Sequence, residues 1–202
     1  MIIGKKHKFV YISHQRAGSH TMFHVLKNRY GGFHYKGDGY HGRKIPNQYK
    51  KFYTFSTCRN PYSLAVSIWR VTVDGVKPRS YGAKFGVYRK VRSNNFKDFA
   101  KWLSKATRRH SHSIIMPQHL WFKGVRRLDT ILHIEDIKIA VLALPFWDKS
   151  VRVGYAKNRT DRGQPHWSTY YTNPRVVDWV QQWAGPDFKK LGYSKEIPSV
   201  TS

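Results

Sequence analysis

The sequence contains only one cysteine, which excludes an internal disulfide and any zinc site built from several cysteines. That residue, Cys58, falls in an apolar run and is expected to pack in the core rather than to act as a nucleophile. Long hydrophobic runs are missing too, since none approaches the ~18 residues of a membrane span, and the initial Met-Ile-Ile is followed at once by Gly-Lys-Lys-His-Lys. The sequence therefore predicts a soluble, cytoplasmic protein without a signal peptide or membrane anchor, or a catalytic domain cut from a longer protein.

Acidic residues are also scarce. Asp and Glu together number 11 against 37 Lys and Arg, which gives a formal net charge of +26. No acidic residue precedes Asp38, and Asp98 is the only one between Lys84 and Arg127. This imbalance indicates an acidic partner, which can be nucleic acid, an anionic membrane surface, a polyanionic glycan or a charged small molecule. A basic face that only aids solubility fits the charge equally well.

Size and composition indicate one packed domain. The chain has 202 residues, of which 40% are hydrophobic and 15% aromatic. A chain of this length buries roughly 70% of its unfolded surface when it folds. Residues 1–202 are therefore predicted to form a single globular domain, because a second complete domain would not fit comfortably in this length.

Short β-prone runs alternate with segments of helical periodicity. Strands are expected at residues 9–12, 52–58 and 129–134. Helices are expected to start near residues 18–21, at 61, after 95, near 117, after 135 and after 173. This alternation predicts an α/β fold: a three-layer α/β/α domain with a parallel central sheet, whose ligands bind at the carboxyl ends of the strands.

Two of the predicted strand–helix connections have the features of anion-binding turns. In the first, Gly18, Ser19 and Thr21 open a helix directly after a buried strand. In the second, Arg59 stands at the end of a strand and Ser67 two turns into the following helix. The amide groups and the positive dipole end of a helix start attract phosphate or sulfate. Two such turns in one small domain indicate a ligand with two anionic ends.

Several motifs along the chain occur in an order known from one enzyme family. The first turn reads Gln15-Arg16-Ala17-Gly18-Ser19-His20, and the second reads Cys58-Arg59-Asn60-Pro61-Tyr62 with Ser67 downstream. Further segments are MPQHLWF at 116–122, DTILHIEDI at 129–137, NRT at 158–160, YYT at 170–172 and DFKKLGY at 187–193. Together these motifs resemble the carbohydrate-type sulfotransferases that use 3′-phosphoadenosine-5′-phosphosulfate (PAPS), although the first turn lacks the proline usual in that family.

The resemblance implies a P-loop NTPase-like fold and a role for each motif. PAPS would be the co-substrate and 3′-phosphoadenosine-5′-phosphate (PAP) the product, with no metal, and the acidic residues form no ligand-like cluster either. The 5′-phosphosulfate would be held by the first turn: Arg16, Ala17, Gly18, Ser19, His20 and Thr21. The 3′-phosphate would be held by Arg59 and Ser67, and a loop with Arg159 and Arg162 would close over the nucleotide. Either Gln15 or Arg16 fills the basic slot of the first turn, and Arg16 is also expected to take part in catalysis.

The acceptor side is implied by the segment GYHGRKI at 39–45. It resembles the Tyr-His-Gly-His segment of heparan sulfate 2-O-sulfotransferases, so His41 is expected to be the catalytic base, with Arg43 in place of the second histidine. The competing bases are His110, His112 and His119, of which His112 and His119 are expected to contact the acceptor. The acceptor would be a hydroxylated glycan, which can itself be anionic.

Two other functional classes compete with the sulfotransferase interpretation. A non-catalytic protein that binds nucleic acid without sequence specificity is compatible with the charge and the interspersed aromatic residues. A nucleotide kinase or NTPase would need the Gly-x4-Gly-Lys-Ser/Thr loop, which the sequence lacks.

Overall fold

The computed structural model describes residues 1–35, 41–73, 91, 94–106, 113–154 and 163–197. They belong to two compact units, one made of residues 1–59 with 120–158 and the other of residues 60–119 with 159–202. Each unit is thus assembled from two separate stretches of chain, and a single domain over 1–202 stays a prediction. No helix of the described ranges is long and apolar enough to cross a membrane.

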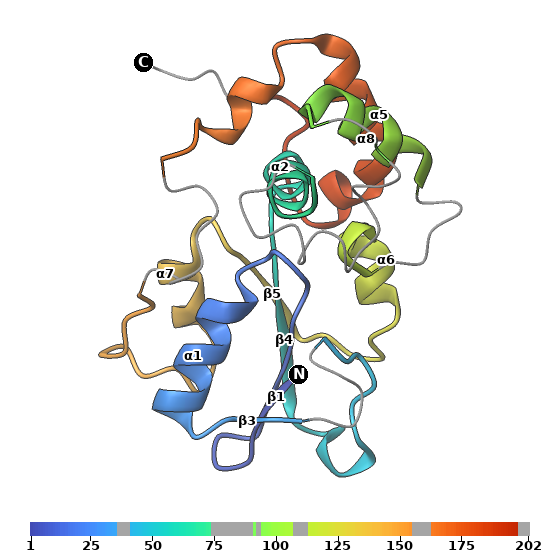
Figure 1. The fold of residues 1–202 in the computed structure, drawn as a ribbon. Helices are drawn as coiled ribbons and strands as arrows, with labels where there is room; N and C mark the ends of the chain where they lie inside the picture. The colour runs from blue at the N-terminus through green and yellow to red at the C-terminus, as the bar shows by residue number, and fades with distance from the viewer. Residues whose placement is uncertain (36–40, 74–90, 92–93, 107–112, 155–162, 198–202) are drawn as a thin grey trace. The chain divides into compact units, whose positions relative to one another are not determined.

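The first unit is built on a five-stranded sheet with the order β3-β1-β2-β4-β5 (Figure 1). The strands are β1 (Ile2–Gly4), β2 (Phe9–Ile12), β3 (Phe33–His34), β4 (Tyr53–Cys58) and β5 (Thr130–His133). The strands β2, β4 and β5 are parallel, as the sequence predicts, with Phe9 opposite Tyr53 and Cys58 opposite His133. Their carboxyl ends therefore meet at one edge of the sheet.

The other edge of the sheet differs from the prediction. The sheet is mixed rather than wholly parallel, because β1 runs antiparallel to both β2 and β3. A tight turn joins β1 to β2, in which the Lys8 amide donates to the Lys5 carbonyl over 3.3 Å. Strands of three and two residues are too short to show the alternation by which a strand is recognised in a sequence.

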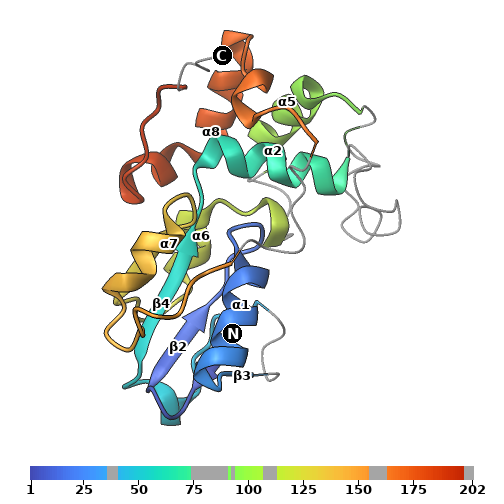
Figure 2. The same ribbon diagram turned by 90° about the vertical axis from the view of Figure 1, so that its left-hand side faces the viewer.

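Different elements cover the two faces of the sheet. One face is covered by α1 (Ser19–Tyr30) and by the segment that starts with α7 (Ile137–Ala140). Figure 2 shows α1 alongside β2. Phe23 and Leu26 of α1 pack there against Tyr11 and Phe55 of the strands. On the opposite face, Tyr49 and Val125 bury Val10 and Ile12. That second cover comes from segments around residues 45–52 and 125–128, which contain only the short 3-10 helix Asn47–Tyr49, rather than from the α-helix layer expected of a three-layer domain.

The second unit is helical where it is described. Its main helices are α2 (Pro61–Thr72), α5 (Phe96–Ala106) and α8 (Pro174–Lys190). The short helix α6 (Gln118–Lys123) begins in the second unit and ends in the first, because the boundary falls after His119. Leu64 and Ile68 of α2 pack with Phe99 and Leu103 of α5 and with Trp183 of α8. The α8 helix is kinked at Ala184, two residues before Pro186.

Asparagine caps explain why the starts of these helices could be predicted. The Asn60 side chain accepts from the amides of Tyr62 and Ser63 over 3.0 and 3.4 Å, and Pro61 occupies the first helical turn. Asn95 accepts from the Asp98 amide and Asn173 from the Arg175 amide. Each cap satisfies an amide that the helix itself leaves unbonded and contributes about 1 kcal/mol.

Candidate functional site

The turn after β2 has a backbone that is constrained at two positions. Arg16 has φ +64° and Gly18 has φ +78°, both in the left-handed region. Glycine adopts this conformation without strain, whereas an arginine there costs about 1–2 kcal/mol. A Cβ atom on Gly18 would come within 2.1 Å of the Ile134 side chain, so only glycine fits. Residues with strained backbone conformations are found preferentially at active sites and ligand-binding turns.

Side chains from the end of β4 hold this turn in place. Arg59 donates from Nη1 to the carbonyl of Arg16 over 3.2 Å, and Thr57 Oγ1 donates to the carbonyl of Ala17 over 2.5 Å. Tyr11 OH lies 2.7 Å from Thr57 Oγ1 and is fully buried with it. The turn is therefore fixed to the parallel strands through its carbonyl groups.

The start of α1 has the chemistry of an anion site. Gly18 is the N-cap of this helix and has no side chain with which to cap the first turn. The helix proper begins at Ser19, followed by His20 and Thr21, and its first turn holds no acidic residue. The dipole of a helix start and its amides favour a bound anion most where no carboxylate competes for them. The predicted residues Arg16 to Thr21 thus form one continuous turn and helix start.

His41 lies beside the same turn. Its Nδ1 atom is 2.8 Å from Ser13 Oγ and 3.3 Å from the Ser13 carbonyl. Ser13 precedes Arg16 by three residues, so the hydrogen-bonded serine and the strained arginine are at most about 11 Å apart along the chain. The structure therefore brings two sequence-predicted elements, the His41 loop and the first anion turn, to one edge of the sheet.

Burial lowers the pKa of His41 to about 4, and repulsion from nearby positive groups, among them His20 and His34, acts in the same direction. The hydrogen bond with the Ser13 backbone opposes this shift without cancelling it. His41 is therefore neutral at pH 7 and can accept a proton. Because Nδ1 is engaged with Ser13, the accepting atom would be Nε2.

The low pKa of His41 predicts a pH dependence of stability. Its unfolded-state pKa is about 6.5, so between pH 6.5 and 4 the unfolded chain binds more protons than the folded one. The free energy of unfolding should fall as pH decreases through this window, by up to roughly 3 kcal/mol. The free energy of unfolding is measured by urea unfolding at a series of pH values. His41→Gln should lack the part of the decrease that His41 causes, whereas His24→Gln, at an exposed position, should show the full decrease. Equal pH profiles for wild type and His41→Gln would contradict the assignment.

An aromatic residue that the sequence did not single out completes the surroundings of His41. Trp121 is 4% exposed, and its ring centroid lies 6.4 Å from that of His41 and 5.6 Å from that of His14, edge-on in both cases. The guanidinium of Arg43 lies over the same ring at 4.7 Å from the centroid and donates to the Trp121 carbonyl over 3.4 Å. Arg43 is thus held against Trp121 by a cation–π contact.

Two predicted site residues belong to the second unit. Ser67 lies in α2 and is 2% exposed. His119 Nδ1 donates to Asp187 Oδ1 over 2.6 Å, and the fully buried Asp187 also accepts from the amides of Gln118 and His119 over 2.8 Å each. A carboxylate that holds one ring nitrogen fixes the tautomer and orientation of a histidine. Asp187 therefore positions the side chain of His119 as well as the start of α6.

Three predicted residues, His112, Arg159 and Arg162, lie outside the described residues, as does the competing base His110. Within the described ranges, no group of three or more His, Cys, Asp or Glu side chains is arranged to hold a metal ion.

Sequence reasoning missed Ser13, Thr57, Trp121 and Asp187. Ser13 and Thr57 are small polar residues at the carboxyl ends of β2 and β4, and that position is the only signal by which they could have been found. Asp187 is one of the few acidic residues of the chain and is the Asp of the DFKKLGY segment. The sequence therefore indicates that Asp187 belongs to a motif but does not reveal which residue it contacts. Comparison with known proteins adds nothing to this list, because no family model, curated protein or solved structure matches the chain.

Proposed function

We propose that this protein is a sulfotransferase that moves a sulfuryl group from PAPS to a hydroxyl of an acceptor, with a carbohydrate as the acceptor class. The proposal includes a P-loop-like sulfotransferase fold, which is supported by the parallel strands β2, β4 and β5 and by the helix that starts directly after the turn at the end of β2. The motif resemblance supplies the identity of the donor.

One observation carries the proposal. The strained turn at Arg16 and Gly18 opens α1 at the edge of the sheet where the parallel strands end. The neutral His41 lies at the same edge, where it is hydrogen-bonded to Ser13. The turn offers amides and a positive dipole to the phosphosulfate, and His41 offers a proton acceptor to a hydroxyl. In-line transfer from an anionic donor to an alcohol requires an anion site and a proton acceptor close to each other.

The chemistry would proceed as follows. The acceptor oxygen attacks the sulfur of PAPS, and a new S–O bond forms as its proton passes to Nε2 of His41. The bond from sulfur to the 5′-phosphate oxygen breaks, and the electron pair leaves with PAP. Arg16 and the amides of the turn would stabilise the charge that develops on the leaving oxygen and on the transferred group. A bound dianionic donor would also raise the low pKa of His41 and make it a stronger base in the complex.

Arg59 is proposed to reach the 3′-phosphate as well as the turn. A guanidinium carries five N–H donors in a planar fork, so its bond to the Arg16 carbonyl is compatible with a phosphate contact. Ser67 stays a sequence-based prediction for the same phosphate, and so do Arg159 and Arg162 for the loop over the nucleotide.

A thermal-shift titration with PAP tests the donor site. At a concentration one hundred times its dissociation constant, PAP should add about 2.7 kcal/mol of stability. ATP and single-stranded DNA should add clearly less, because ATP has no 3′-phosphate and the phosphates of DNA are diesters rather than the monoesters of PAP. Arg59→Ala should abolish the selective response, since it removes a phosphate contact and a tether of the turn. The matched control is Arg29→Ala, an exposed cation in the last turn of α1.

The same titration separates the main alternative. If PAP, ATP and single-stranded DNA stabilise the protein equally, and Arg59→Ala behaves like Arg29→Ala, the chain is a general polyanion binder and the sulfotransferase proposal is wrong. Non-specific binding to nucleic acid would then account for the net charge of +26.

A further inference from the structure

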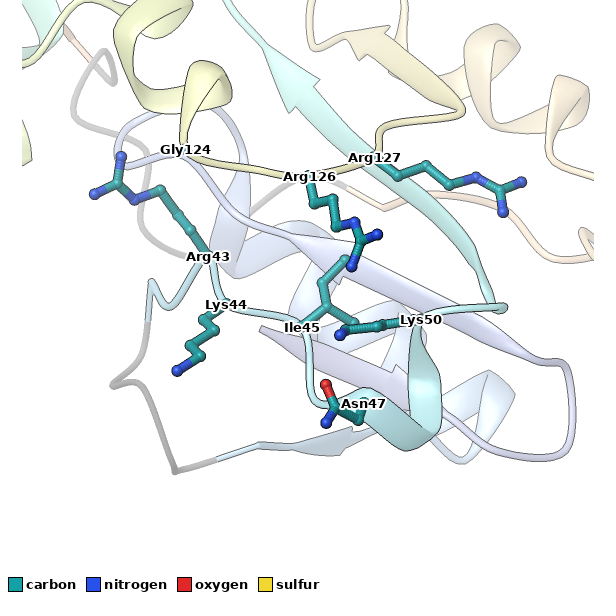
Figure 3. Close-up of a pocket in the computed structure, with 8 residues that line it drawn as sticks. All are labelled: Arg43, Lys44, Ile45, Asn47, Lys50, Gly124, Arg126 and Arg127. Atoms are coloured by element: carbon teal, nitrogen blue, oxygen red, sulfur yellow. The ribbon is translucent and has the colours of Figure 1, made fainter.

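The first unit contains a pocket of about 700 Å³ that is not lined by the anion turn or by His41. It lies between residues 43–50 and residues 124–127, whose side chains Figure 3 shows on either side of it. Pockets that enclose whole small molecules have volumes of about 300–1,000 Å³. The volume of this pocket therefore suits a compact molecule rather than a single ion.

The lining of the pocket is strongly basic. None of the described lining residues is acidic. Arg127 has a counter-ion outside the lining, because it forms an ion pair with Asp129 over 2.7 Å. Cations that surround one cavity repel one another and favour an anion with several charges. Four further cations line the pocket: Arg43, Lys44, Lys50 and Arg126.

Four cations around so compact a volume match phosphate better than sulfate or carboxylate. A phosphomonoester carries about −1.5 to −2 charges at pH 7, so about two or three such groups would balance four cations. A sulfate ester or a carboxylate carries a single charge, so four of them would have to fit into the same volume. An arginine also binds a phosphate through two parallel N–H bonds. The lining thus favours a small molecule on which phosphomonoesters stand close together.

The lining offers nothing to a nucleobase. It contains no aromatic residue in the described part of the chain, and its only apolar side chain is Ile45. Trp121, which lies nearby, is buried beneath the guanidinium of Arg43. Single-stranded nucleic acid is bound by cations together with aromatic platforms for the bases. Asn47 adds an amide that can donate to and accept from a hydroxyl group. The part of the molecule that carries the phosphates is therefore polar and hydroxylated rather than aromatic.

The position of Arg43 is fixed before anything binds. Its guanidinium lies over the Trp121 ring at 4.7 Å from the centroid and donates to the Trp121 carbonyl over 3.4 Å. Gly124 leaves room for it, because a Cβ atom on Gly124 would lie 2.6 Å from Arg43 Nη1 and 3.0 Å from Cζ. A cation that is already ordered loses less conformational entropy when a phosphate binds to it. Gly124→Ala would move this cation without changing the charge of the protein.

We propose that this pocket binds a small polyphosphorylated molecule, in which a compact hydroxylated ring carries two or more phosphomonoesters, as in an inositol polyphosphate. This chemistry occurs both free in solution and as the headgroup of a membrane lipid. Lys50 and Arg126 lie just before the amino ends of β4 and β5, whereas the anion turn follows the carboxyl end of β2. Binding in the pocket uses neither Arg16 nor Arg59, so it does not depend on the proposed sulfuryl transfer.

Calorimetric titration of the full chain with myo-inositol hexakisphosphate at physiological salt tests the proposal. The comparison compound is myo-inositol hexasulfate, which has the same ring and the same number of anionic groups. It should bind at least about tenfold more weakly, because each of its groups carries only one charge. Equal affinities for the two compounds would overturn the preference for phosphate and with it the proposal.

Two variants of equal charge locate the binding site. Gly124→Ala should weaken the binding of hexakisphosphate about three- to tenfold, because the new methyl group displaces the guanidinium of Arg43. Gly154→Ala is the matched control, since Gly154 is exposed and nothing lies within 4 Å of the position of its Cβ atom. If both variants bind like wild type, Arg43 does not contact hexakisphosphate and the pocket is not its site.

A second pair of variants separates the pocket from the net charge. Lys50→Ala/Arg126→Ala should weaken the binding of hexakisphosphate at least about tenfold. Lys101→Ala/Lys105→Ala removes two exposed cations of α5 and should change the affinity less than about threefold. The melting temperatures should stay within about 2 °C of wild type, because all four side chains are exposed. Equal losses in the two double variants would overturn the proposal.

Vesicles distinguish the two sources of the phosphate groups. Phosphatidylcholine vesicles that contain phosphatidylinositol bisphosphate should bind the protein more strongly than phosphatidylserine vesicles of equal charge, and Lys50→Ala/Arg126→Ala should lose this difference, if the source is a lipid headgroup. Binding of hexakisphosphate without that difference assigns a free molecule, and binding of neither overturns the proposal. Arg59→Ala should bind hexakisphosphate like wild type, so the pocket and the donor site can fail separately.

Discussion

Gly18→Ala is expected to lower the free energy of unfolding by about 2–4 kcal/mol and to abolish the response to PAP. Two costs add up at this position. The residue has φ +78°, which strains any side chain, and a Cβ atom would meet Ile134 Cδ1 at 2.1 Å and Cγ1 at 2.9 Å. Relief of the contact would push the turn away from the end of β5. The amides that are proposed to bind the phosphosulfate would then lose their positions.

Gly31→Ala is the matched control for this experiment. Gly31 ends the same helix with φ +62°, but nothing lies within 4 Å of the position of a Cβ atom. Its substitution should cost only the conformational strain, about 1 kcal/mol, and leave the PAP response intact. Adding Ile134→Ala to Gly18→Ala should remove the steric part, so the double variant should lose less than the two single variants summed. Equal costs for Gly18→Ala and Gly31→Ala, or an unchanged PAP response in Gly18→Ala, would refute the assigned role of the turn.

His41→Gln is expected to reduce sulfuryl transfer by 10²- to 10⁴-fold, the usual contribution of a general base, and to leave the thermal shift with PAP unchanged. Glutamine keeps a hydrogen-bonding group near Ser13 but cannot accept the proton of an alcohol. The measurement is transfer of labelled sulfate from PAPS to a panel of glycans, phenols and small alcohols. His24→Gln on the exposed face of α1 controls for the loss of an imidazole.

The competing base is tested in the same assay. His119 is positioned by the buried Asp187, so His119→Gln and Asp187→Asn should both reduce transfer if His119 is the base. His112→Gln covers the candidate outside the described residues. If one of these variants removes transfer while His41→Gln retains it, the base assignment moves to that residue and the donor site is unaffected.

Local signals explain which parts of the fold could be predicted. The starts of α2, α5 and α8 follow Asn60, Asn95 and Asn173, whose side chains cap the helices through bonds that span two or three residues. The strands β2 and β4 are largely buried, β5 buries Leu132, and apolar, β-prone runs mark all three in the sequence. The antiparallel β1 and β3 have no such signal, because their pairing is decided by the rest of the sheet.

The candidate site shows the same division. Gly18 and Arg59 could be named from the sequence because a strand–turn–helix connection constrains its own residues. The bond between Ser13 and His41 joins residues 28 positions apart, and that between His119 and Asp187 joins residues 68 apart. No pattern along the chain encodes such contacts. Tertiary packing alone decides which of eleven histidines acquires a partner and a shifted pKa.

The division of both units into two stretches of chain has a consequence for synthesis on the ribosome. Residues 60–119 are made before the first unit is finished, yet α2 and α5 pack with Val180, Trp183 and Phe188 of α8, which are made much later. At roughly 5–20 residues per second, the apolar faces of α2 and α5 wait several seconds for that partner. The nascent chain thus carries an uncovered apolar surface, in a protein with a large excess of positive charge. Synthesis of this protein should therefore depend on chaperones more than its modest length suggests.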